Sequence, residues 1–90
     1  MKMKDYIKVY PSILNYAKLA LLSDHLYRRY FELALVAVRN KDNGRLPDTD
    51  DIAWFLRSTE EEVLQDISAL MNEGLVKLED DMLSISTEIG

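Results

Sequence analysis

The stretch GRLPDTDDIAWFLRSTEEEVLQDISALMNEGLVKLEDDMLSIS, residues 44 to 86, decides the fold. Its first part predicts a short helix, because Asp48 can cap the free backbone amides while Asp50 and Asp51 complement the positive end of the helix dipole. This helix is expected to close at Arg57 and Ser58. Its buried side is expected to consist of Ile52, Ala53, Phe55 and Leu56.

A second helix is expected to start only a few residues later, at a capping-box sequence. Thr59 should accept a hydrogen bond from the amide of Glu62, whose carboxylate reaches back to the amide of Thr59. Gly74 is a natural C-terminal stop. Between these points, apolar residues recur at helical spacing and predict one buried stripe, formed by Val63, Leu64, Ile67, Leu70 and Met71.

After Gly74 the apolar period changes from about 3.6 to 2 residues, which is typical of strands. Asp80 and Asp81 can form a two-residue reversal between two such strands. The alternating apolar residues on the two strands are Val76, Leu78, Leu83 and Ile85. Helix, short turn, longer helix and hairpin is the order of a winged helix-turn-helix, a mainly α fold with a small β-hairpin.

The preceding residues predict three more elements. The first ten favour a strand or extended segment that ends at Pro11, and a helix is expected from Ser12 to Leu19. A longer helix, capped by Ser23, is expected from Asp24 to Arg39 and supplies the third side of the core; residues 40 to 44 form a turn. The apolar face of this helix comprises Leu26, Tyr27, Tyr30, Leu33, Ala34, Ala37 and Val38, and its polar side carries His25, Arg28, Arg29 and Glu32.

The composition restricts the chemistry of the chain. Its 90 residues suffice for one domain, expected to span residues 1 to 90, with 1 to 22 as an N-terminal extension and 23 to 86 as the core. There is no cysteine, there is one histidine, and the three glycines form no phosphate-binding loop. We therefore expect no enzyme activity, catalytic residue, cofactor, metal site or small-molecule substrate. No apolar run approaches the roughly 20 residues of a membrane span, so no membrane partner and a cytoplasmic location are expected.

Several segments also resemble a known family. GRLP at residues 44 to 47, DIAWFLR at 51 to 57 and LMNEGLV at 70 to 76 resemble the N-terminal winged-helix domain of phage and prophage replication initiators, the replisome-organiser type. IKVYPSIL at residues 7 to 14 is similar to the segment that precedes that domain. The resemblance implies a DNA-binding domain that acts at a replication origin, usually followed by a region that recruits helicase-loading partners.

Charge is unevenly distributed along the chain. Residues 1 to 57 carry ten Lys and Arg against seven Asp and Glu, whereas residues 58 to 90 carry one against nine. The outer positions of the second helix are expected to hold the carboxylates of Glu60, Glu61, Glu62, Asp66 and Glu73 and no cation. Because affinity for duplex DNA depends chiefly on neutralising phosphates, insertion of this helix into the major groove is disfavoured. DNA contact is expected instead from Arg28, Arg29, Arg45, Arg57 and Lys77.

Two functions remain open. The first is a nucleic-acid-binding module in phage-type replication initiation. The second is a protein-interaction or dimerisation winged helix that does not bind DNA, in which the acidic helix and the basic first half associate head-to-tail or with a partner such as a replication protein. Trp54 fits a stacking role, but we expect it at the edge of the core with its indole N-H at the surface.

Overall fold

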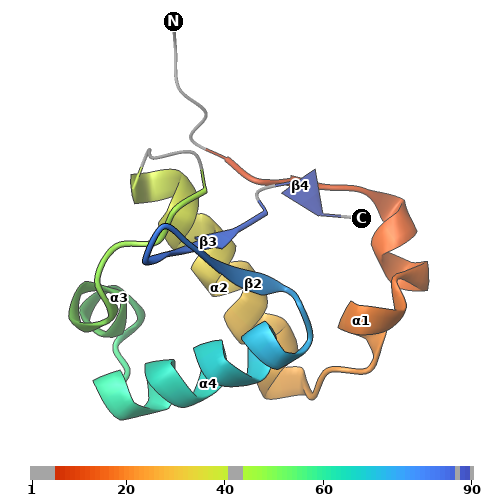
Figure 1. Cartoon of the computed structure of the whole chain (residues 1–90). Helices are drawn as coiled ribbons and strands as arrows, with labels where there is room; N and C mark the ends of the chain where they lie inside the picture. Colours follow the sequence, from red (N-terminus) through yellow and green to blue (C-terminus); the bar gives the residue numbers. More distant parts are fainter. Residues whose placement is uncertain (1–5, 41–43, 87, 90) are drawn as a thin grey trace, which may run out of the picture.

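The computed structural model, described for residues 6–40, 44–86 and 88–89, is mostly helical with a small antiparallel hairpin, as predicted. The hairpin consists of β2 (Val76–Glu79) and β3 (Met82–Ile85). Figure 1 shows the long helix α2 (Asp24–Asn40) behind the hairpin, α4 (Glu60–Asn72) below it and α3 (Thr49–Leu56) at one side. Within the described part of the chain, every helix is too short or too polar to cross a membrane.

The core lies where the helices and the hairpin meet. Leu33 of α2, Ile52 of α3 and Leu70 of α4 are fully buried in one apolar cluster. α2 begins at the predicted residue, and the hydroxyl of Ser23 accepts a hydrogen bond from the amide of Leu26 at 3.2 Å. Because each large buried side chain contributes about 1.5–3 kcal/mol, packing on this cluster stabilises helices that would be marginal alone.

The turn between α3 and α4 is short. Arg57 adopts a left-handed conformation with φ of 54°, and the amide of Ser58 donates to the carbonyl of Ala53 at 3.0 Å. The hydroxyl of Thr59 then caps α4 by accepting from the amide of Glu62 at 3.1 Å, as predicted. The Glu62 carboxylate accepts from the Thr59 hydroxyl at 3.3 Å, where the prediction had it reach the Thr59 amide. Half of the capping box is therefore confirmed.

The two other predicted helix ends differ in outcome. Gly74 follows α4 with φ of 74°, and its amide donates to the carbonyl of Met71 at 2.9 Å, so the predicted stop is confirmed. Asp48 occupies the cap position of α3, but its side chain makes no capping hydrogen bond, and that prediction is wrong. Asp50 accepts instead from the amide of Asp51 at 3.0 Å.

The hairpin has the predicted two-residue turn. Asp80 and Asp81 have φ of 52° and 61°, a conformation that matches the twist of the flanking strands. Val76 pairs with Ile85, and both side chains are buried. Leu78, nearer the turn, is 57% exposed, because the tip of the hairpin extends beyond the core.

Gly44 and Arg45 add a third backbone segment beside β3. The carbonyl of Gly44 accepts from the amide of Ile85 at 2.9 Å, and Arg45 forms an antiparallel bridge with Ser84. Gly44 has φ of 80°, and a Cβ at this position would lie 2.6 Å from the carbonyl oxygen of Ile85. Only glycine fits this close approach without a shift of the backbone. The predicted turn before it falls partly on residues 41–43, outside the described residues.

The predicted N-terminal strand is present as β1 (Lys8–Val9). It pairs in parallel with β4 (Glu88–Ile89), an element that the sequence did not predict. The amide of Tyr10 continues the pairing by donating to the carbonyl of Ile89 at 2.8 Å. Because Ile89 is 1% exposed, this contact brings the last described strand into the core.

The prediction of one continuous helix from Ser12 to Leu19 is wrong. A 3-10 helix, η1 (Pro11–Asn15), and a short helix, α1 (Ala17–Ala20), are separated by Tyr16, whose backbone is extended. Ile13 and Leu19 are both buried. In an unbroken helix, residues six apart point about 120° away from each other, so the break allows both side chains to reach the core.

Candidate nucleic-acid interface

One of the predicted DNA-contacting cations, Arg29, is buried. Its side chain is 3% exposed, and its Nε donates to Oδ2 of Asp66 at 2.8 Å. A second guanidinium nitrogen donates to the Ser58 hydroxyl at 2.9 Å, and the third lies 3.4 Å from a carboxylate oxygen of Glu32. Arg29 therefore fastens α2 to α4 and to the turn before it. The prediction that Arg29 contacts DNA is wrong, because its charge is enclosed by these groups.

Asp66 was expected on the outer side of α4 and faces the core instead. Its side chain is 11% exposed, and the oxygen that accepts from Arg29 also lies 2.8 Å from Nε2 of His25. His25, placed on the polar side of α2 by its sequence pattern, thus contacts α4 while remaining half exposed. A sequence signal existed: Asp66 stands three residues after Val63 and four before Leu70, and both are buried.

The outer face of α4 is acidic and partly apolar. Four of the five carboxylates predicted there are exposed, and α4 contains no Lys or Arg; the four are Glu60, Glu61, Glu62 and Glu73. Leu64 and Met71, which were predicted to be buried, are 48% and 37% exposed. The reason is that Val63, Ile67 and Leu70 already fill the contact of this helix with the core. This face would repel phosphates.

A groove between α2 and α3, which we call the α2–α3 groove, carries arginines and exposed apolar side chains. It consists of two adjoining hollows that share Arg39 and Phe55. The guanidinium of Arg39 lies over the Phe55 ring, 4.8 Å from its centre. Leu35, which is 52% exposed, lines one hollow, and Trp54 and Arg57 line the other.

Two predictions about α3 are therefore wrong. Trp54, expected at the core edge, is 78% exposed, and Phe55, expected in the core, is 38% exposed. The two rings meet edge-on with centres 5.7 Å apart. In a helix of eight residues, Ile52 and Ala53 face the core, and the positions that follow them directly must turn outward.

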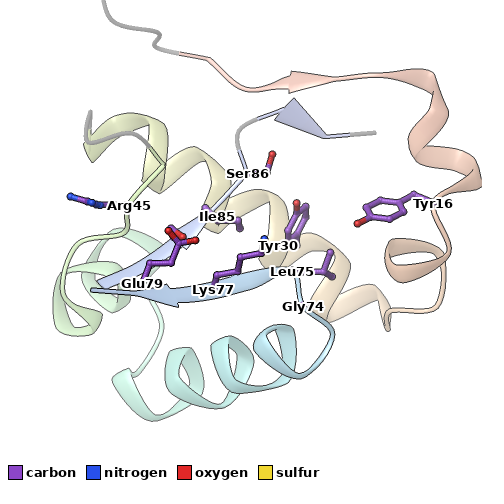
Figure 2. A pocket seen from close by; sticks show the side chains of 10 residues that line it. Tyr16, Tyr30, Arg45, Gly74, Leu75, Lys77, Glu79, Ile85 and Ser86 are labelled. Atoms are coloured by element: carbon purple, nitrogen blue, oxygen red, sulfur yellow. The ribbon is translucent and has the colours of Figure 1, made fainter. Parts of the chain in front are cut away.

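A further hollow, separate from the α2–α3 groove, lies over the hairpin (Figure 2). Arg45 and Lys77, two of the predicted DNA contacts, line it together with the carboxylate-bearing Glu79. Tyr16 points into the hollow from the N-terminal segment toward Tyr30 of α2. Burial of the phenol, and then the nearby Tyr16, raise the pKa of Tyr30 above its ordinary value of 10.0.

The predicted cations thus divide among different places. Arg45 and Lys77 share the hollow over the hairpin, and Arg57 joins Arg39 in the α2–α3 groove. Arg28 is 69% exposed on α2, with its Nε 3.9 Å from the Glu32 carboxylate. Arg39 was not among the predicted contacts, although its place in the last turn of α2, four residues after Leu35, could have indicated it.

One cluster of carboxylates also stands near α3. Asp48, Asp50 and Asp51 are exposed and bring one oxygen each within 4.8 Å of one another. They lie at the N-terminal end of the helix, where its dipole favours negative charge. The dipole accounts for this cluster without a bound cation.

Comparison of the chain with protein-family models, with curated proteins and with solved structures gave no match. Function is therefore inferred from the groups that the molecule presents at its surface.

Proposed function

We propose that the chain is a winged helix-turn-helix domain that binds duplex DNA in phage-type replication initiation. The order of α2, α3, α4 and the hairpin supports this fold, as does the short turn between α3 and α4. The bridge between Arg45 and Ser84 adds the third strand position found beside the hairpin in winged helices. The resemblance of residues 44–47, 51–57 and 70–76 to replication initiators supports action at an origin.

The observation that carries DNA binding is the pairing of cations at two surface hollows, Arg45 with Lys77 and Arg39 with Arg57. Arg45 precedes α3 and Arg57 ends it, so α3 has a cation near each end. The outer face of α4 has none. In this proposal phosphates contact the α3 side of the helix-turn-helix, and α4 is kept out of the major groove by its own carboxylates.

The small number of cations limits the expected affinity and its salt dependence. Neutralising four phosphates of B-DNA gives a slope of log K against log salt of about −3.6. Between 50 and 200 mM salt, this slope corresponds to a loss of affinity of roughly 150-fold. Binding should therefore be easy to detect at low salt and weak at physiological salt.

Fluorescence anisotropy with a labelled duplex, titrated at several salt concentrations, tests the proposal. Replacing Arg39, Arg45, Arg57 and Lys77 by alanine together should abolish binding at low salt. The single change Arg57→Ala should make the slope shallower by about 0.9, the share of one phosphate. Lys8→Ala is the control, because Lys8 is a cation on β1 that lines neither of these hollows. Failure of the wild-type chain to bind duplex at low salt would overturn the proposal.

A further inference from the structure

We propose that copies of the chain associate head-to-tail, with the outer face of α4 from one copy lying in the α2–α3 groove of the next. This inference goes beyond DNA binding and does not depend on it. It commits the α2–α3 groove to a second copy of this chain, which would compete with DNA for Arg39 and Arg57.

The α2–α3 groove has the composition of a protein-binding surface. Leu35, Trp54 and Phe55 leave 52%, 78% and 38% of their surfaces exposed along these two adjoining hollows, and exposed apolar patches rimmed by polar residues are typical of protein interaction sites. Arg39 and Arg57 border the hollow that Trp54 lines, and Glu32 lies in the adjoining hollow beside Leu35. Aromatic residues and arginine are the types that contribute most at protein interfaces.

The outer face of α4 has the complementary composition. Leu64 and Met71 are exposed and lie seven residues apart. Glu61 stands three residues before Leu64, and Ser68 stands three residues before Met71. These four positions follow helical spacing and form a straight stripe, which we call the α4 stripe. Its acidic end is supplied by the first turn, where all three residues are glutamates. An amphipathic helix of this kind fits an apolar groove bordered by cations.

The α4 stripe cannot occupy the groove of its own copy. The opposite side of α4, with Val63, Ile67 and Leu70, packs into the core against α2 and α3. No residue of α4 lines the groove, so within this fold the stripe and the groove can meet only between copies. A contact between two different surfaces is heterologous, so each added copy leaves one stripe and one groove open for the next.

Two double variants separate the two surfaces. Arg39→Glu with Trp54→Glu removes charge and apolar area from the α2–α3 groove. Glu61→Lys with Leu64→Lys does the same to the α4 stripe, and it spares Glu60 and Glu62, which bond to Thr49 and Thr59. Both variants keep a negative net charge, so overall attraction cannot draw them together.

Sedimentation equilibrium between about 10 µM and 1 mM is the measurement. The wild-type mass should rise with concentration beyond twice the 10.4 kDa of the chain. Each double variant alone should remain at 10.4 kDa, whereas their equimolar mixture should form a heterodimer that grows no further. A wild-type chain that stays monomeric, a groove variant that still self-associates, or a mixture that stays monomeric would each overturn the proposal.

The controls carry the same charge changes at other exposed positions. Lys18→Glu with Leu21→Glu matches the groove variant, and Glu79→Lys with Leu78→Lys matches the stripe variant; Leu21 and Leu78 are 86% and 57% exposed. Both controls should associate like the wild-type chain. If a double variant unfolds, Trp54→Ala and Leu64→Ala give a milder test, in which each should weaken association about tenfold. Unchanged association in both would also contradict the proposal, whatever the DNA titration shows.

Discussion

Replacing Arg29 by methionine is expected to destabilise the fold by about 3–5 kcal/mol. Methionine preserves an unbranched stem but removes the guanidinium that donates to both Asp66 and Ser58. The buried Asp66 carboxylate would then keep His25 alone as a partner on α2. Breaking a buried ion pair from one side leaves an uncompensated charge, and this cost dominates the change.

Removing both charges should reverse most of this loss. The double variant Arg29→Met with Asp66→Leu is expected to lie within about 1 kcal/mol of the wild-type chain, because an apolar pair of similar volume avoids the desolvation of both ions. The coupling free energy is the sum of the two single losses minus the loss of the double variant. It should therefore be at least about 2 kcal/mol, and larger by whatever Asp66→Leu alone costs. For a chain of this size, 3 kcal/mol corresponds to a fall in Tm of at least about 12 °C.

Urea denaturation of the wild-type chain, the two single variants and the double variant, followed by circular dichroism, measures this cycle. Destabilisation of less than about 1 kcal/mol by Arg29→Met, or additive effects of the two changes, would refute the structural role of the pair. In the DNA titration, folded Arg29→Met should keep the wild-type salt slope, in contrast to Arg57→Ala.

Three further outcomes are expected. The free energy of unfolding should fall as pH rises above about 10, because Tyr30 ionises at its ordinary pKa in the unfolded chain while burial keeps the folded phenol protonated. Urea denaturation at about pH 9 and 11 should show a smaller fall for Tyr30→Phe than for the wild-type chain, and an equal fall would contradict this. Gly44→Ala should cost at least about 2 kcal/mol, since its φ is 80° and its Cβ would clash with Ile85; a loss below about 0.5 kcal/mol in denaturant would oppose this account. Arg57→Gly should raise the free energy of unfolding by about 0.5–1 kcal/mol, because φ is 54° at this position and glycine adopts positive φ without strain; an unchanged Tm would argue against backbone strain. The same change should make the DNA salt slope shallower.

The sequence was sufficient where the determinants are local. The cap at Thr59, the stop at Gly74 and the turn at Asp80 and Asp81 each depend on residues within a few positions, and all three are confirmed. These signals also place α4 and the hairpin along the chain, but apolar spacing alone did not distinguish the buried Val63, Ile67 and Leu70 from the exposed Leu64 and Met71.

Prediction failed where distant residues decide the outcome. Arg29 and Asp66 are 37 residues apart, so nothing local shows that two charged positions face each other across the core. The β1–β4 pair joins residues from the two ends of the described chain and spans only two residues on each side. The cations of the candidate site were visible in the sequence, but only the fold shows that one is buried and that Arg39 completes a groove.

The parallel pairing of β1 with β4 has a mechanical consequence. Tension applied before β1 and after β4 would pull the two strands along their length in opposite directions, because parallel strands start at the same end of the pair. Their backbone hydrogen bonds, together with the bond from Tyr10 to Ile89, would then be loaded at the same moment in shear. The helices and the antiparallel β2–β3 hairpin lie between β1 and β4 in the sequence. The force would therefore reach the helices and the hairpin only after the hydrogen bonds of the β1–β4 pair had broken.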